Sequence, residues 1–153
     1  MNSRIVFVLL LFSMFFSCAD LSDENEFGDD FILKAGTVCG WCTVNDTLEI
    51  KGVEVRYVNY EQCNNAVAAV DKKGKLLKSE IENLLDKFDE KEFKSIELNT
   101  CNVCVDGCDN WIYFENSKGS HYIRFGGSDK KLEPIQMFID QLFLIKESYS
   151  GTN

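Results

Sequence analysis

Thiols are the residues of this chain whose type and spacing could most readily do chemistry. The sequence contains seven cysteines, and three of them fall within eight residues of one another. Thiols in this number can pair as disulfides, hold a metal ion or exchange electrons, and the compartment of the protein decides among these uses. We expect the cluster to tie two halves of one domain together. Six of the cysteines lie beyond residue 30: Cys39, Cys42, Cys63, Cys101, Cys104 and Cys108.

The first seventeen residues have the pattern of an export signal. A polar start with Arg4 precedes an apolar run from residue 5 to residue 16 that only Ser13 interrupts. This run is too short to span a bilayer comfortably, and such a segment is removed rather than folded. We therefore treat residues 1–17 as a signal peptide and expect an oxidising compartment, which favours disulfides.

The apolar run ends at Ser17 and Cys18, an arrangement that resembles the lipobox of bacterial lipoproteins. The resemblance implies that the Cys18 thiol carries a lipid such as palmitate and that Cys18 is the mature N-terminus. The alternative is ordinary signal-peptidase cleavage after Ala19, with Ser17 and Ala19 as the two small residues. Either route removes Cys18 from the pairing problem and leaves six cysteines.

Residues 18–30 form an acidic segment with six carboxylates and no base. Self-repulsion and few large apolar groups predict an extended, solvated tether. An acidic run behind a lipidated cysteine resembles the surface-export signals of Bacteroidota-type lipoproteins, and an ordinary spacer is the alternative. The resemblance implies an exported protein anchored at the outer membrane, on its periplasmic or cell-surface face. The domain that follows resembles the small Cys-containing lipoprotein domains of unknown function from these bacteria, which implies no activity.

The net charge argues against nucleic acid as a partner. The whole chain carries −9, and because the signal peptide contributes only the positive charge of Arg4, the remainder carries −10. A surface of that sign repels phosphate backbones.

Alternation of apolar and polar residues predicts strands in the first half of the domain. The segments 47–50 and 53–58 alternate and flank a turn, so we expect a hairpin with Val53 among the inward-facing residues. The pattern is lost between residues 60 and 74, and we expect Cys63 to lie there in a loop.

Helical spacing predicts two helices. Ser79 and Glu82 have the spacing of a capping box at the start of a helix that continues to residue 88 or 93. Pro134 suits the first turn of a second helix, which we expect to end near Tyr149. One apolar stripe marks its buried face: Ile135, Phe138, Ile139, Leu142 and Ile145.

The remaining strands complete the predicted fold. A short strand is expected to begin at Ile96, and the segments 111–115 and 121–125 flank a turn typical of a hairpin. Together these elements predict an α+β fold: an antiparallel sheet of about five or six strands with two helices packed on one face, stabilised by disulfides. We assign residues 31–149 to this single domain and 150–153 to a C-terminal tail.

The pair Cys39 and Cys42 has the CxxC spacing of thiol–disulfide oxidoreductases. In such enzymes the first thiol is activated at a helix N-terminus. Here residues 43–58 read as β structure, and Pro134 opens a helix instead of preceding a strand that faces the thiols. Thiol–disulfide exchange through this pair remains the alternative to a protein that catalyses nothing.

Two CxxC pairs would also suit a four-thiolate zinc site. Such a site would use residues 39, 42, 101 and 104 and leave Cys63 and Cys108 unexplained. We therefore expect three disulfides and neither metal nor cofactor. Six cysteines allow many connectivities. Because a bridge inside a CxxC closes a very small ring, we expect long-range links between the 39–63 region and the 101–108 cluster.

No catalytic set can be assembled from the other polar residues. His121 is the sole histidine, and it falls on a predicted strand with no identifiable nucleophile. Asp106, Asp109 and Asn110 offer oxygens near a glycine, but their order does not match a calcium loop. Turn chemistry accounts for them.

Trp41 and Trp111 each adjoin a cysteine group. Large aromatic residues commonly fill the core of a small domain, whereas an exposed tryptophan marks a candidate binding surface. We therefore expect a non-catalytic binding or structural module, held at a membrane through its N-terminal lipid, with an unknown protein or small-molecule ligand.

Overall fold

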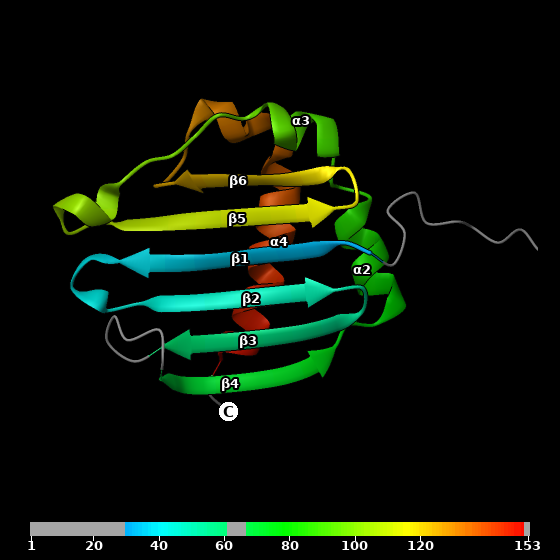
Figure 1. Cartoon of the computed structure of the whole chain (residues 1–153), viewed down its shortest axis with the longest axis horizontal. Coiled ribbons are helices and arrows are strands. Elements are labelled where there is room, and N and C mark those ends of the chain that lie inside the picture. Colours follow the sequence, from blue (N-terminus) through cyan, green and yellow to red (C-terminus); the bar gives the residue numbers. More distant parts are fainter. Residues whose placement is uncertain (1–29, 61–66, 152–153) are drawn as a thin grey trace, which may run out of the picture.

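A six-stranded antiparallel sheet forms the centre of the protein (Figure 1). The computed structural model describes residues 30–60 and 67–151, without the side chain of Cys42. The signal peptide, Cys18, most of the acidic tether and Cys63 lie outside the described residues. The strand order is β4-β3-β2-β1-β5-β6. The strands are β1 (Ile32–Cys39), β2 (Asn45–Lys51), β3 (Glu54–Tyr60), β4 (Ala68–Lys75), β5 (Cys108–Asn116) and β6 (Gly119–Phe125).

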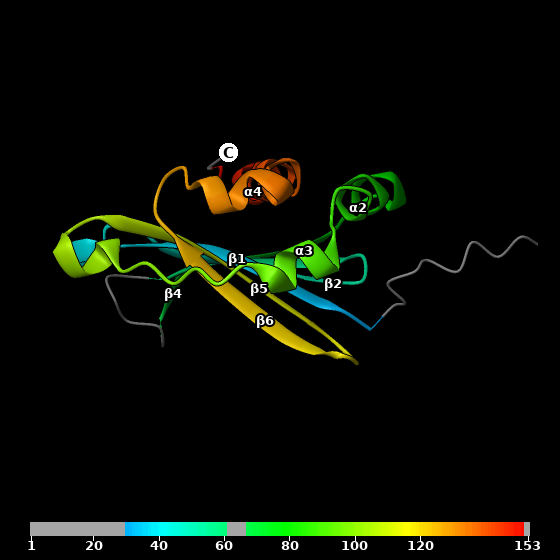
Figure 2. The same cartoon turned by 90° about the horizontal axis from the view of Figure 1, so that it is seen from above.

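The α-helices lie on one side of this sheet (Figure 2), which confirms the predicted α+β fold. The longest helix, α4, crosses behind the strands in Figure 1. None of the helices in the described parts of the chain has the length and apolar character needed to cross a membrane. The helices are α2 (Lys78–Leu85), α3 (Glu90–Ser95) and α4 (Gln136–Ser150), and the 3-10 turns are η1 (Gly40–Cys42), η2 (Asn102–Val105) and η3 (Lys130–Ile135).

The core lies between the sheet and these helices. Alternation along the inner strands turns one apolar face toward the helices, as Leu48 and Ile50 of β2 illustrate by being fully buried. The apolar stripe of the last helix is also buried, as predicted. Phenylalanine rings from several elements meet at the centre: Phe88, Phe93, Phe114 and Phe138.

The two predicted hairpins are confirmed, with one error at a turn. β2 pairs with β3, and β5 pairs with β6. Gly52 takes a φ of 55° in the first turn, a left-handed conformation that glycine adopts without strain. Val53 belongs to this turn and is 41% exposed, so its predicted inward orientation is wrong.

The predictions were least accurate at the two edges of the sheet. β4 occupies residues that we expected to be loop, because its side chains are mainly lysines and other exposed residues and give no apolar alternation. The strand predicted at Ile96 is wrong as well. Only Asn99 forms an isolated bridge to Arg124, while the main chain of Leu98 and Thr100 bonds to the same residue.

The first predicted helix is two helices. α2 ends at Leu85, and Asp89 caps the start of α3 by accepting a hydrogen bond from the Glu92 amide at 2.9 Å. The predicted capping box is also wrong, because the free amide at the start of α2 is that of Leu77 and it bonds to Glu80 at 2.7 Å. Pro134 lies in η3, and α4 begins two residues later.

A buried ion pair fastens α4 to the sheet. Lys146 Nζ lies 2.8 Å from both carboxylate oxygens of Asp46 and 2.8 Å from Thr37 Oγ1. Tyr57 donates a hydrogen bond to the same carboxylate. Burial, together with the negative charge of Asp46, raises the pKa of Tyr57 to about 12. The network is enclosed between helix and sheet, so we assign it a structural role.

Candidate functional site

The described residues place the clustered cysteines at one end of the sheet, in a structure that we call the tip. The tip consists of η1, which follows β1, and residues 101–107, which precede β5 (Figure 1). β1 and β5 are neighbouring strands, and their register places Cys39 opposite Cys108. A disulfide joins these two residues across 69 positions of sequence. The long-range link predicted between the two cysteine groups is therefore confirmed for this pair.

The two turns of the tip are packed tightly against each other. The Gly40 amide donates a 2.8 Å hydrogen bond to the Gly107 carbonyl. A side chain at position 40 would meet Asp106 Cα at 2.7 Å, so only glycine permits this approach. The turns therefore behave as one unit.

A second disulfide joins Cys101 to Cys104 inside the tip. We expected long-range links and no bridge within a CxxC, and for this pair the expectation is wrong. The 3-10 turn between the two cysteines brings their Cα atoms to 5.3 Å, a separation that a disulfide spans readily. The disulfide prediction is thus confirmed for four cysteines, while Cys63 and the side chain of Cys42 lie outside the described residues.

Asp109 holds residues 100–103 in place through hydrogen bonds. Its carboxylate, fully shielded from solvent, accepts hydrogen bonds from Thr100 Oγ1 at 2.8 Å, from the Asn102 amide at 3.1 Å and from the Val103 amide at 3.1 Å. The Asn102 side chain and the Arg124 guanidinium bond to it as well, the latter at 2.8 Å. One carboxylate therefore replaces the backbone partners that this irregular segment lacks.

The same contacts fix the charge of Asp109. Burial disfavours its ionised form, but the hydrogen bonds from Thr100, the two backbone amides and Arg124 outweigh burial and lower the pKa to about 2. We expected only turn chemistry from this aspartate. Its position beside a cysteine at the start of a strand was the sole sequence signal, and the partners that give it its role come from two separate segments, residues 100–103 and β6.

The tip displays two apolar side chains to solvent. Trp41 is 83% exposed and Val105 is 78% exposed. Trp41 also has a φ of 55°, and Asp106, next to Val105, has a φ of 62°. A left-handed backbone is unusual for a bulky residue and persists only where the surroundings enforce it. Core filling therefore does not account for Trp41, which becomes the leading candidate for a binding surface.

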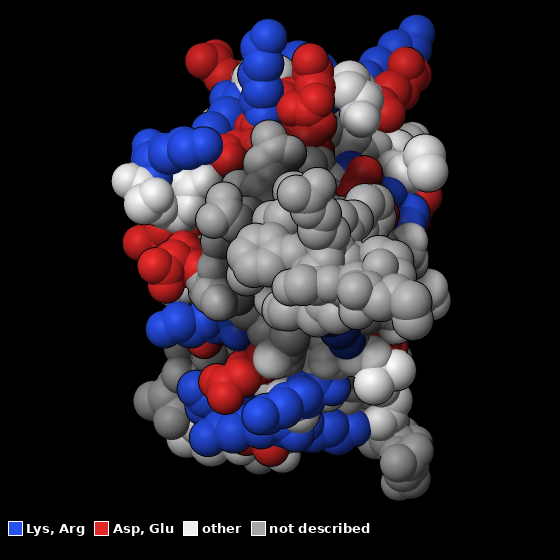
Figure 3. Space-filling view, turned by 90° about the vertical axis from the view of Figure 1, so that its right-hand side faces the viewer, with Lys and Arg blue, Asp and Glu red and all other residues white. Residues whose placement is uncertain are grey.

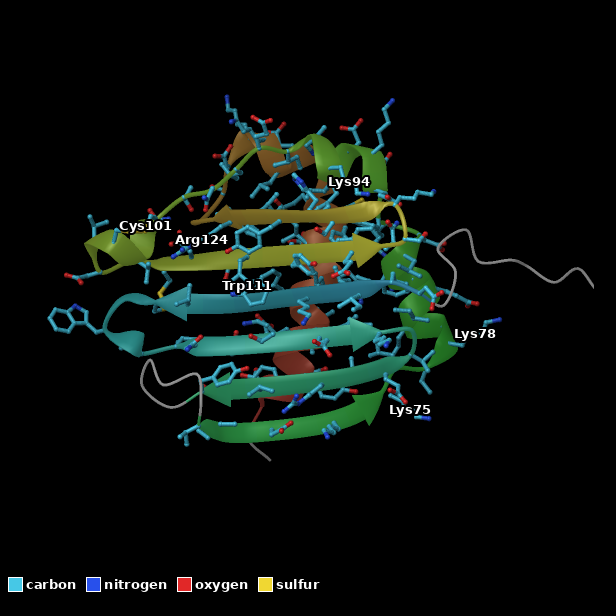
Figure 4. The ribbon with its side chains drawn as sticks, viewed as in Figure 1. Lys75, Lys78, Lys94, Cys101, Trp111 and Arg124 are labelled. Carbon is cyan, nitrogen blue, oxygen red and sulfur yellow. A yellow bond between two sulfur atoms is a disulfide. The ribbon has the colours of Figure 1, made fainter. Side chains whose placement is uncertain are left out.

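Trp111 occupies a different surface. It lies on the side of the sheet that the described helices leave uncovered, which we call the open face (Figures 2 and 4). Its indole packs over Gly36 of β1 and next to Tyr122 of β6. The two tryptophans are thus not brought together in one site.

The alternatives based on free thiols gain no support from the geometry. Cys39 is bonded to Cys108, so the Cys39–Cys42 pair expected for thiol–disulfide exchange is not formed. Cys101 and Cys104 are bonded to each other and not arranged around a zinc position. Across residues 30–60 and 67–151, no three His, Cys, Asp or Glu side chains gather in a way that could hold a metal ion.

His121 is a strand residue, and its contacts are those of a packed side chain. Its Nε2 atom lies 2.9 Å from the Ile96 carbonyl oxygen, and its ring meets the edge of Phe93 at a centroid distance of 5.3 Å. Through these contacts the imidazole holds the segment around Ile96 beside β6.

A charged hollow of about 510 Å³ lies beside the free edge of the sheet, at β3 and β4. Figure 3 shows lysine and arginine side chains gathered along this border of the molecule. Arg56, one of the lining cations, is already bonded to Asp71 at 2.7 Å. Lysines on an edge strand prevent pairing with other chains, and this role explains Lys73 and Lys75.

The tip is therefore the surface that the residues single out: two exposed apolar side chains on a unit held by two disulfides and one buried carboxylate. No protein-family model matches the chain, and no curated protein matches it either.

Proposed function

We propose that this protein is a lipid-anchored envelope protein whose domain binds a partner protein through the tip, and that it catalyses no reaction. The observation that carries the proposal is the exposure of Trp41 in a turn that a disulfide and a main-chain hydrogen bond tie to the rest of the tip. Tryptophan is prominent among the residues that dominate protein interfaces.

The position of the tip supports this role. The described chain begins at Asp30, two residues before β1, whereas the tip follows the last residue of the same strand (Figure 1). Eight residues of strand span about 26 Å at about 3.3 Å per residue. A domain attached to a membrane through its N-terminal segment would thus carry the tip at its far end, directed toward a partner in the surrounding space.

The anchor rests on the sequence alone, through Ser17, Cys18 and the acidic segment behind them. The expected location is the outer membrane, on its periplasmic or cell-surface face. Intact mass of the protein extracted from membranes should show a chain that begins at Cys18 and carries acyl groups. The Cys18→Ser variant should appear in the soluble fraction, and a variant that stays in the membrane fraction would remove the lipid anchor from the proposal.

Binding through the tip is tested independently of the anchor. The soluble Cys18→Ser protein, labelled with a fluorophore, is titrated onto envelopes isolated from its own host. We expect saturable binding that Trp41→Ala weakens at least about tenfold, as truncation of a central interface tryptophan commonly does. Met137→Ala is the matched control, because Met137 is also exposed and apolar but lies on α4. Equal binding by Trp41→Ala and wild type would refute the role of the tip.

A further inference from the structure

Three aromatic side chains share the open face of the sheet. Trp111 and Tyr113 are alternate residues of β5, and Tyr122 of β6 lies directly opposite Tyr113. The rings of Trp111 and Tyr122 are 6.2 Å apart between centroids and inclined by only 30°. We call these three residues the aromatic platform. Figure 4 looks onto this face, with Trp111 near the middle of the sheet.

Gly36 allows the platform to be flat. It is the residue of β1 opposite Trp111, and a methyl group built at position 36 would come within 2.5 Å of two atoms of the indole ring. The indole therefore lies against the backbone of β1 instead of standing away from the sheet. Tyr122 beside it is 44% exposed, while Trp111 and Tyr113 are partly exposed, so solvent reaches the platform.

The charges that border the platform are already paired. Arg124, opposite Trp111, bonds to Asp109 at 2.8 Å. Lys34, opposite Tyr113, bonds to Glu49 at 2.7 Å. Each cation thus already has a carboxylate partner, which an anionic ligand would have to displace.

We infer that the open face is a binding site for a neutral saccharide, centred on Trp111 and Tyr122. The C–H face of a pyranose ring is flat and apolar and stacks on an aromatic side chain, while its hydroxyl groups seek polar side chains at the rim. The platform supplies both features, because Lys34 and Glu49 border it and Glu115 accepts a hydrogen bond from the Tyr113 hydroxyl. This site is separate from the tip and does not depend on the function proposed for it.

Tryptophan fluorescence gives a direct test. The sequence has two tryptophans, so the Trp41→Phe variant leaves Trp111 as the only reporter and leaves the platform unchanged. Combined with Cys18→Ser to give a soluble protein, this variant is titrated with neutral hexasaccharides of β-linked glucose, α-linked glucose and N-acetylglucosamine, and with hexagalacturonic acid as an acidic comparison. We expect at least one neutral sugar to change the emission of Trp111 in a saturable manner, and the acidic sugar to leave it unchanged.

Variants of the platform assign the site. Tyr122→Ala should weaken binding on the order of tenfold, the loss typical of one stacking partner. Met137→Ala on α4 should bind as the parent does, and thermal unfolding identifies any variant that fails to fold. Because Tyr122 is half exposed, its removal spares the core and keeps the test valid even if Trp111→Ala does not fold.

Several results would overturn the inference. The absence of a saturable change with every neutral sugar would do so, as would binding of the acidic sugar alone. Unaltered affinity of Tyr122→Ala would show that the sugar binds elsewhere. Sedimentation equilibrium would reveal a different occupant: a dimer that Tyr122→Ala dissociates would mean that a second copy of the chain covers the open face.

Discussion

The carboxylate of Asp109 should make the stability of the protein depend on acid. Its pKa of about 2 in the folded protein lies below its ordinary value of 3.8. A depressed pKa stabilises the folded state above the ordinary value, and this contribution is lost as pH falls through 3.8 toward 2. The difference corresponds to about 2–3 kcal/mol at about 1.4 kcal/mol per pH unit. The side chain is shielded from solvent, so salt should screen little of this contribution.

Asp109→Asn isolates this contribution. The amide keeps one acceptor oxygen, but it removes the charge opposite Arg124 and presents a donor to a site full of donors. We expect a loss of about 3 kcal/mol near neutral pH, since breaking a buried ion pair leaves its partner uncompensated. Below about pH 2 the aspartate of the wild type is itself neutral, so the difference should shrink by about 2–3 kcal/mol.

Urea unfolding of both proteins, with disulfides intact and at a series of pH values, measures the difference. Asp71→Asn is the matched control, because Asp71 also pairs with an arginine but is exposed. Its effect should be smaller and should disappear in high salt. A difference between Asp109→Asn and wild type that does not change with pH would show that ionisation of Asp109 does not stabilise the tip.

Three further substitutions test other parts of the structure. Lys146→Met removes the cation of the buried pair and should cost about 3–5 kcal/mol in urea unfolding; a cost below about 1 kcal/mol would mean that the pair is hydrated. Cys39→Ala removes the disulfide to Cys108, whose two cysteines are 69 positions apart in the sequence, and should cost about 4 kcal/mol of stability under non-reducing conditions. Under reducing conditions the variant and the wild type should be equally stable. Gly36→Ala should cost about 1–3 kcal/mol and shift the emission of Trp111, whereas an unchanged spectrum would contradict the packing of the indole on β1.

Much of the fold follows from periodic patterns in the sequence. The alternation around Leu48 and the stripe through Phe138 locate strands and a helix, because burial of one face is what each pattern encodes. β4 lacks such a pattern, since an edge strand protected by Lys73 and Lys75 buries little. Sequence patterns report burial, and β4 is held mainly by main-chain pairing with β3.

The candidate site was less predictable for a related reason. The cysteines indicated where cross-links would form, but pairing depends on which strands are neighbours, and the adjacency of β1 and β5 is not a local property. The role of Asp109 was equally hard to predict, because its partners include residues as far apart in the sequence as Thr100 and Arg124. Trp41 was one of two candidates, and only its backbone conformation and exposure separate it from Trp111.

The most direct test of binding through the tip is site-specific photo-cross-linking in the anchored protein. A photoreactive amino acid replaces Trp41 in one variant and Met137 in another, both in cells of the native host. We predict one discrete adduct from position 41, none from position 137, and loss of the adduct when soluble wild-type domain is added in excess but not when its Trp41→Ala form is added. Equal labelling from the two positions, or competition by both soluble forms, would contradict the assignment of the tip as the binding surface.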